Sequence, residues 1–473
     1  MENQPLPVPP VSRAARVTPA EILKNVIVGL TVSFVALSLG AALGILSGRG
    51  AFAGMFSAGI IAFICSLFGG TRIQCSGPTA PMGALTATVV SFAYENPPVA
   101  LADFDPNHFI TVVLLLTGAI LVLMAVLRLG KFISLVPNVV ISGFMSGIAL
   151  LIWIGQIESI FGLAGKRALT GPVILNFACA LTTVALIFII PGLLKKWFPR
   201  LSHFLPGTLV AIVLMTLIAN LLQLPIGHVS LDGHLGSIAD LTALIHSQWP
   251  SVWSHELIVA AVPFAIQLSL LCYLDTLLTS LVIDKMTGES TRQDRELVAQ
   301  GVANASVALI GGIPGAQATI RSVLMVKEHA TLRLAGIVAG ILVLIEMLLF
   351  QDAINLIPKA VFAGVLFKVG YDVFDFRPLR LYFKELTRYR AQLFTDFFSR
   401  HDEEPIFVSN REFLLIIGTA VVTIAWNLNI AVAGFTALFY LHNRLLWKHN
   451  PIRDLKPVEE TEGVFWKGDD RVI

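Results

Sequence analysis

The chain has 473 residues, of which 55% are hydrophobic and 14% are charged, and its net charge is +2. Because a soluble domain carries about 25% charged residues, this composition argues against a soluble enzyme and indicates a lipid-embedded protein. The near-neutral balance shows no overall basic bias of the kind associated with nucleic-acid binding.

Apolar segments follow one another along most of the chain, and a membrane span needs roughly 20 such residues. Fourteen segments are predicted, at residues 24–47, 52–70, 78–93, 108–129, 133–154, 173–194, 206–224, 257–284, 296–311, 317–326, 333–350, 357–374, 411–427 and 429–447. The sequence therefore predicts an all-α polytopic membrane protein. Its transporter domain would span residues 22–447, between an N-terminal tail (1–21) without a signal peptide and a C-terminal tail (448–473).

Basic residues occur in alternate loops, whereas residues 201–284 contain no Lys or Arg. Since positive charge stays on the cytoplasmic side, both termini are expected in the cytoplasm. The expected location is the plasma membrane, which is the inner membrane in a Gram-negative cell.

Two segments are short and broken by Gly or Pro, beginning at Ser76-Gly77-Pro78-Thr79 and at Gly315-Ala316-Gln317-Ala318-Thr319. A Gly-Gly pair precedes each of them, and the two pairs are 242 residues apart. Seven segments separate the pairs, so the two halves would have opposite topology. Inverted repeats with matching broken helices are typical of transporters, and we expect them over about 22–224 and 257–447.

The N-terminus of a half-helix presents free N–H groups and the positive end of a dipole. Two facing N-termini can hold an anion, and the hydroxyls of Thr79 and Thr319 can donate to it. Pro78 suits the first turn of such a helix. The alternative is that Gly and Pro merely kink two packed helices.

Asp275 lies deep in the eighth segment, where a carboxylate costs at least ~2.5 kcal/mol and is by default functional. Thr279 follows four residues later on the same helical face. This pair indicates a sodium site of hard oxygens. A proton relay and a buried Asp bonded to a neighbouring helix are the alternatives.

Two more charged residues lie in apolar segments. Arg321 follows the second half-helix start, where it would either add positive potential to the anion site or extend towards the cytoplasm as an anchor. Glu346 lies near the end of the eleventh segment, which favours an interfacial position.

The remaining polar features lie outside the spans or form no recognised motif. Residues 378–411 alternate apolar and basic side chains, as in an amphipathic cytoplasmic helix on anionic lipid, with a partner-binding helix as the alternative. The loop histidines match no metal motif, and the cysteines are expected to be buried thiols. These residues are His228, His234, His246, His255, Cys65, Cys75, Cys179 and Cys272.

Several ordered motifs resemble the sulfate permease (SulP) family of anion transporters. They are Asp284-Lys285-Met286-Thr287-Gly288, Glu296 to Asn304, Gly311-Gly312-Ile313-Pro314, Phe68-Gly69-Gly70 and Pro137 to Gly155. The resemblance covers roughly residues 22–447. It implies two inverted seven-segment repeats that form a core and a gate domain. The anion would then lie between the N-termini of the third and tenth segments, and the core would move against the gate like an elevator.

Two details are most similar to the cyanobacterial sodium-dependent bicarbonate transporters, namely an Asp with Thr four residues later and the Ala-Thr at the tenth segment. This resemblance implies sodium at Asp275, Thr279, Ala318 and Thr319, and bicarbonate at Thr79, Ala80 and Thr319. Gln317 stands where that type has Gly and is counted with the sodium shell, while Arg321 is counted with the anion site.

The chain also departs from the family pattern. Only 26 residues follow residue 447, whereas family members usually end in a long cytoplasmic STAS domain. This chain is therefore expected either to lack that domain or to have had it removed, which leaves open the homodimer that the family would imply.

The leading hypothesis is secondary active transport of a small inorganic anion, as a sodium-coupled bicarbonate symporter without an organic cofactor. Its alternatives are a proton-coupled or exchanging sulfate or dicarboxylate permease and a non-transporting sensor or scaffold. An enzyme is not expected, since no Walker loop, HExxH or nucleophile elbow is present.

Overall fold

A computed structural model describes most of the chain as helices. The described residues are 18–95, 105–131, 136–163, 168–197, 207–229, 238–250, 253–388, 410–426 and 428–446, with short pieces at 408, 452, 455–460 and 463–467. The first half contains α1 (Pro19–Leu46), α2 (Gly50–Phe68), β1 (Ser76–Gly77), α3 (Ala80–Glu95), α4 (Pro106–Val126), α5 (Asn138–Phe161), α6 (Val173–Trp197) and α7 (Gly207–Leu221).

The second half repeats this order of helices around a second short strand. It contains α8 (Ile238–Gln248), α9 (His255–Thr287), α10 (Gln293–Ala308), β2 (Ala316–Gln317), α11 (Thr319–Lys327), α12 (Leu334–Leu349), α13 (Gln351–Asn355), α14 (Lys359–Val373), α15 (Phe376–Arg388), α17 (Asn410–Ala425) and α18 (Leu428–Leu441). A π-helical turn (His442–Leu446) and a hairpin of β3 (Lys456–Glu460) and β4 (Gly463–Lys467) follow.

Each of the fourteen predicted segments contains a helix, which confirms the all-α class. Six described helices are long and apolar enough to cross a membrane, namely α1, α2, α4, α5, α6 and α9 as far as Asp284. Helices α3, α7 and α12 are apolar but shorter. The number of membrane crossings therefore stays a prediction.

The fifth helix begins and ends later than the predicted segment 133–154. Pro137 is its extended N-cap, and Gly162 ends it in the left-handed conformation with φ 67°. Proline favours the start of a helix and glycine its end. These two residues thus set the boundaries more strongly than hydropathy does.

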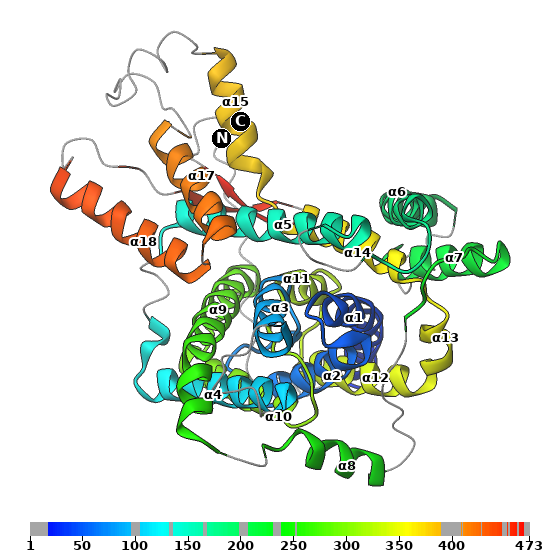
Figure 1. The fold of residues 1–473 in the computed structure, drawn as a ribbon. Helices are drawn as coiled ribbons and strands as arrows, with labels where there is room; N and C mark the ends of the chain where they lie inside the picture. Colours follow the sequence, from blue (N-terminus) through cyan, green and yellow to red (C-terminus); the bar gives the residue numbers. More distant parts are fainter. Residues whose placement is uncertain are drawn as a thin grey trace.

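The helices form two layers (Figure 1). One layer, the gate, contains α5, α6, α7, α14, α17 and α18. The other, the core, contains α1, α2, α4, α9, α10 and α12, with α3 and α11 on its side towards the gate. The layers touch where α1 meets α14 and where α3 meets α5.

Helix pairing inside the core is symmetric between the two halves. Helix α2 packs against α12 as α10 packs against α4. Both contacts need glycine: a β-carbon on Gly59 would lie 3.1 Å from the carbonyl oxygen of Gly340, and one on Gly118 would lie 2.5 Å from that of Gly301. Such backbone approach is typical of helix packing in membranes. In each contact a helix of one half packs on a helix of the other half, and the two contacts are equivalent, as two inverted repeats require.

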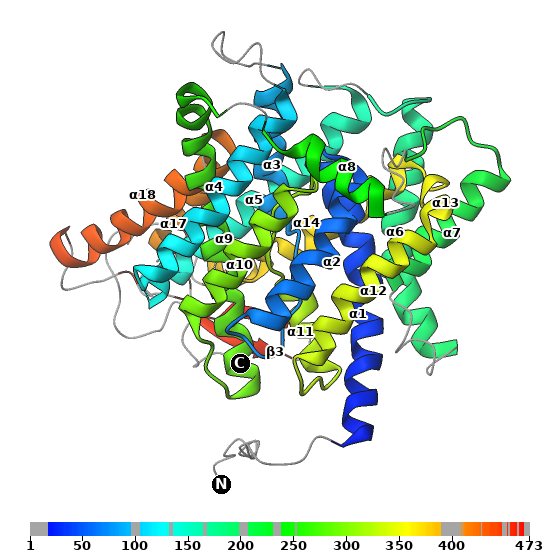
Figure 2. The same ribbon diagram turned by 90° about the horizontal axis from the view of Figure 1, so that it is seen from below.

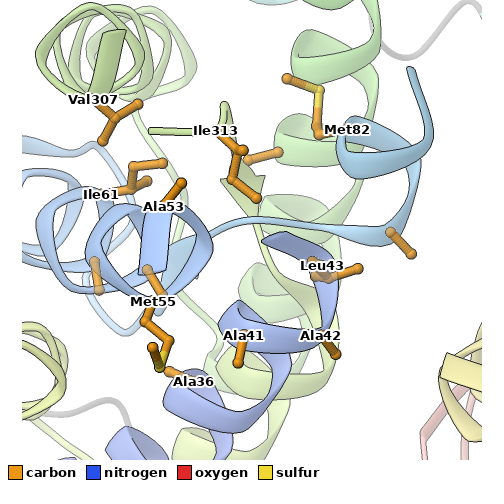
Figure 3. Close-up of a cluster of buried hydrophobic side chains, with 14 of the residues drawn as sticks. Ala36, Ala41, Ala42, Leu43, Ala53, Met55, Ile61, Met82, Val307 and Ile313 are labelled. Carbon is orange, nitrogen blue, oxygen red and sulfur yellow. The ribbon is translucent and has the colours of Figure 1, made fainter. Parts of the chain in front are cut away.

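Small residues also fill the centre of the core. Figure 3 shows Ala36 and Ala41 of α1 close to Met55 of α2. All three side chains are at most 3% exposed. The dense packing of α1 on α2 provides a firm base for the broken segments.

Helix α8 and the start of α1 lie at opposite ends of the molecule. In Figure 2, α8 crosses the top while α1 begins at the bottom. The sequence did not indicate α8, which lies in the loop that lacks basic residues. Its position opposite the start of α1 agrees with the predicted topology.

The predicted amphipathic stretch 378–411 is described only in part. Helix α15 covers its beginning, and Arg380 lies over the ring of Phe376 at 6.0 Å. Residues 389–407, and residues 1–17 of the N-terminal tail, lie outside the described part. All four cysteines are buried thiols, as predicted.

Candidate functional site

The two broken segments meet directly at the middle of the core. Strands β1 and β2 pair antiparallel, with Ser76 opposite Gln317 and Gly77 opposite Ala316. Helices α3 and α11 begin two or three residues after these pairs, at Ala80 and Thr319. The pairing therefore brings two helix N-termini together, and both can attract negative charge.

Glycine permits this close approach. Gly77 has φ 150°, and a β-carbon there would lie 2.9 Å from Nη1 of Arg321. A β-carbon on Gly315 would lie 2.3 Å from the carbonyl carbon of Gly77. A larger residue at position 315 would displace the strand around Gly77, and one at position 77 would meet the Arg321 guanidinium in a backbone conformation that favours glycine.

The structure corrects the expected role of Pro78. This residue precedes α3 rather than lying in its first turn, and its carbonyl accepts a hydrogen bond from Nη2 of Arg321 at 2.9 Å. Pro81 takes the position in the first turn. Since a helical proline is tolerated there, the half-helix still starts cleanly.

Asp275 of α9 faces this junction. Its carboxyl interacts with Thr79 and electrostatically with Arg321. Nevertheless, Oδ2 of Asp275 and Oγ1 of Thr79 are buried, and neither meets hydrogen-bond geometry with a described residue. A buried polar atom without a partner is costly. These two atoms are therefore available to a ligand.

Thr279 and Thr319 bring a second pair of oxygens to the site. Their hydroxyl oxygens are 2.6 Å apart, which joins α9 to the first residue of α11. Thr279 lies one turn after Asp275, so both project from the same face of α9. The predicted helical pairing of Asp275 and Thr279 is thus present, with Thr319 opposite.

Gln317 is held by the neighbouring polar face of α9. Its Oε1 accepts hydrogen bonds from Ser280 at 2.7 Å and Thr71 at 3.3 Å, and its backbone N–H donates to Thr276 at 3.2 Å. The carboxamide oxygen is therefore committed to Ser280 and Thr71, while Nε2 is buried without a hydrogen-bond partner among the described residues. Because an amide nitrogen does not coordinate a cation, only the Gln317 backbone remains as a candidate ligand of a cation beside Asp275.

Ala80 and Ala318 stand at the two helix starts. Ala80 is the first residue of α3 and Ala318 is the N-cap of α11, and each is at most 8% exposed. The Ala318 N–H donates to the carbonyl of Cys75 at 3.3 Å. Their small side chains leave the helix N-termini open.

Arg321 is buried, with 1% of its surface exposed. The structure therefore contradicts the alternative in which this side chain extends to the cytoplasmic surface. Besides the bond to Pro78, its Nε and Nη1 have no hydrogen-bond partner among the described residues. The guanidinium thus adds a positive charge and spare donors beside the two N-termini.

A layer of polar residues behind the strands fixes their position, and the sequence motifs gave no role for it. Asn304 accepts from the Gly315 N–H at 2.8 Å and donates to the Gly315 carbonyl at 3.0 Å. Glu296 accepts from the Thr71 N–H at 2.9 Å and from Gln74 at 3.0 Å. The spacing of Glu296, Gln300 and Asn304, each one turn apart on the same face of α10, was the signal available in the sequence.

Comparison with known proteins places the chain in a family. The model of the sulfate permease family matches residues 22–389. The bicarbonate transporter BicA of Picosynechococcus is 33% identical over 365 residues, which cover 74% of this chain and 62% of BicA. BicA of Synechocystis is 34% identical, with 73% and 60% covered. The chain thus matches about three-fifths of the length of these curated relatives.

Solved structures show the same fold. The transmembrane domain of a cyanobacterial bicarbonate transporter BicA superposes with a TM-score of 0.69 at 28% identity, covering 89% of this chain and 99% of that domain. The murine anion transporter Slc26a9 in its inward-facing state gives a TM-score of 0.67 at 16% identity, covering 94% and 71%. The second match concerns the fold alone. The chain is a multi-pass integral membrane protein that belongs to the sulfate permease family.

Proposed function

We propose that the protein is a sodium-coupled bicarbonate symporter of the plasma membrane. The observation that carries the proposal is the junction of the two half-helix N-termini beside Asp275, whose Oδ2 has no hydrogen-bond partner among the described residues. A site that offers both anion donors and a free carboxylate oxygen suits an anion and a cation bound together.

The anion half of the proposed site consists of donors. The amides at the starts of α3 and α11, the hydroxyls of Thr79 and Thr319 and the unpartnered Nε and Nη1 of Arg321 would bind bicarbonate. Charge-assisted hydrogen bonds of this kind are about twice as strong as neutral ones. Ala80 and Ala318 would leave room for the anion next to the amides.

The cation half consists of oxygens. Asp275 would supply a carboxylate and Thr279 and Thr319 would supply hydroxyls, while the backbone at Gln317 and Ala318 would supply carbonyl oxygens. Transporters coordinate sodium with unwound backbone carbonyls and hard side-chain oxygens of this type. Thr319 would contact both ions and so couple their binding.

Charge balance supports one cation for each monovalent anion. Asp275 and Arg321 interact electrostatically and together carry no net charge when both are ionised. Sodium plus bicarbonate adds none, so the loaded and empty sites have the same charge. Because moving a charge through the membrane potential costs about 2.3 kcal/mol per 100 mV, such a carrier would be driven by the sodium gradient alone.

An elevator movement agrees with the division into layers. Every proposed ligand lies on α9 or in the two broken segments, at residues 79–80 and 317–321, all of which belong to the core. Strand pairing and the Thr279–Thr319 contact tie these elements together. The core would therefore carry the two ions past the gate as one body.

The names of the relatives support the choice of anion. Two matching proteins are named bicarbonate transporters. A Neurospora crassa protein named sulfate permease 2 is also similar, at 24% identity over 73% of this chain. Proton-coupled or exchanging sulfate transport is therefore the second candidate.

Uptake into proteoliposomes tests the proposal. Labelled bicarbonate and labelled sulfate would be offered at fixed pH, first with sodium and then with potassium outside. We expect bicarbonate uptake that requires sodium. Sulfate uptake driven by a proton gradient and indifferent to sodium would establish the second candidate instead.

The proposed orientation places α15 in the cytoplasm on anionic lipid and α8 outside. Single cysteines in place of the exposed Lys384 and Thr242 would report this, since all four native cysteines are buried. A membrane-impermeant thiol reagent added outside intact cells should label Thr242→Cys only. Labelling of Lys384→Cys under these conditions would overturn the topology.

A further inference from the structure

A second acid lies inside the core, away from the proposed site. Glu346 of α12 is 5% exposed, and its Oε1 lies 2.6 Å from the hydroxyl of Ser33 near the middle of α1. The sequence favoured an interfacial position because Glu346 lies near the end of its segment. The structure corrects this expectation, since the side chain turns inwards to α1.

The surroundings of Glu346 offer no countercharge. Helix α12 packs chiefly against α1 and α2, whose titratable groups are Glu21, Lys24 and Cys65. None of these interacts with the Glu346 carboxyl, for which Ser33 is the single polar contact among the described residues. On α12 itself, the neighbouring Val343 and Met347 are almost completely buried.

The number of available hydrogens indicates the protonation state of this acid. The Ser33 hydroxyl has one hydrogen and lies 2.8 Å from the Leu30 carbonyl and 2.6 Å from Oε1 of Glu346. Neither acceptor carries a hydrogen when Glu346 is ionised, so only one of the two short contacts would be a hydrogen bond. A proton on Glu346 lets Ser33 donate to Leu30 and accept from the acid, which makes both.

The surroundings of the second carboxyl oxygen also indicate that Glu346 is protonated. Oε2 of Glu346 is buried and has no partner among the described residues. An ionised carboxylate in the membrane interior costs at least about 2.5 kcal/mol, and an isolated buried charge neutralises itself when it can. A neutral acid leaves only an unbonded carbonyl oxygen, which costs much less.

We propose that Glu346 is a proton-binding site of the core, occupied near neutral pH and paired with Ser33. It lies on α12 and α1, whereas the proposed sodium and bicarbonate ligands lie on α9 and in the two broken segments around β1 and β2. The proton therefore binds at a separate position and does not replace sodium at Asp275. The protein retains this proton at Glu346 only while α12 is packed against α1.

Infrared spectroscopy of the purified protein in lipid tests this inference without measuring transport. Near neutral pH, the wild-type spectrum minus that of Glu346→Gln should contain the C=O stretching band of a protonated carboxylic acid. Glu296→Gln is the matched control, because Glu296 accepts hydrogen bonds from three donors and is expected to be ionised. Its difference spectrum should contain carboxylate bands instead.

Ser33→Ala keeps the test decisive if Glu346→Gln does not fold. Removal of the hydroxyl should shift the acid band, since the proton on Glu346 loses its acceptor. Carboxylate bands in place of the acid band for Glu346→Gln, or an unchanged acid region for Ser33→Ala, would overturn the proposal. The readout is also independent of the substrate, so failure of bicarbonate uptake would leave this result unaffected.

Discussion

Glu296 and Asp275 are two acids of the same core, the first buried and the second partly buried, and their surroundings are opposite. Three hydrogen bonds reach the Glu296 carboxylate, from Thr71, Gln74 and Gln300. Glu296 also lies in the first turn of α10, where the helix dipole stabilises negative charge. Asp275 lies in the interior of α9 and has a buried oxygen without a partner. The protein itself supplies the hydrogen-bond donors that Glu296 needs, whereas the free oxygen of Asp275 needs a ligand.

This difference separates a structural acid from one kept for binding. A buried carboxylate that has all its donors rigidifies its surroundings, and here it fixes the loop that precedes β1. A carboxylate with a buried oxygen that has no partner is maintained at a cost, which bound sodium would offset. Burial alone therefore says little about the function of an acid. Whether each of its oxygens has a hydrogen-bond partner says more.

The largest effect should follow from Asp275→Asn. Loss of the carboxylate removes the charged ligand of sodium, worth about 2–3 kcal/mol, so the sodium half-saturation for uptake should rise ~30- to 150-fold. Asp284→Asn is the control on the same helix, because both of its oxygens already accept from Thr291. Wild-type sodium dependence in Asp275→Asn would remove this acid from the cation site.

Glu296→Gln should instead act on stability. The amide places a donor against the N–H groups that face the carboxylate, which costs about 1–3 kcal/mol. We expect a lower Tm in detergent and a sodium half-saturation close to wild type. An unchanged Tm together with a raised sodium half-saturation in Glu296→Gln would contradict this distinction between the two acids.

A smaller effect is expected for Thr319→Val, which keeps the shape of the side chain but removes its hydroxyl. Loss of one hydrogen bond of about 1–1.4 kcal/mol should weaken the affinity for bicarbonate ~5- to 10-fold. Thr86→Val is the control, since the buried Thr86 hydroxyl donates to the Met82 carbonyl of its own helix. Equal bicarbonate half-saturation in both variants would exclude Thr319 as a ligand.

The smallest effect should come from Gln317→Ala. The carboxamide is bonded to Ser280 and Thr71, and both hydroxyls have other partners. The backbone that faces the site is retained, so the sodium half-saturation should change less than about twofold. A change as large as that of Asp275→Asn would mean that the side chain itself binds the cation.

Much of this arrangement follows from local sequence. Hydropathy places the helices, and Gly77, Pro78 and Gly315 mark the breaks because they disfavour a continuous helix. The spacing of Asp275 and Thr279 puts both on one face of α9. These features depend on residues that are close in the chain.

The remaining features depend on contacts between distant segments. The pairing of Ser76 with Gln317, the bonds of Thr71 and Gln74 to Glu296, and the contact of Glu346 with Ser33 join residues more than 200 positions apart. No local pattern distinguishes a Glu that turns towards a neighbouring helix from one that reaches the interface. For that reason the sequence located Glu346 correctly along its helix and misjudged its surroundings.

The exchange of partners between the two halves also constrains biosynthesis. Helix α2 packs on α12 and α4 on α10, so these two core helices of the first half lack their partners until the chain has been made to about residue 349. Membrane helices insert first and associate afterwards. The ribosome must therefore deliver about half of the second repeat before the core can close, and until then Gly59 and Gly118 lack the helices that cover them. Substitutions at these glycines should consequently reduce the yield of assembled protein at the stage of synthesis.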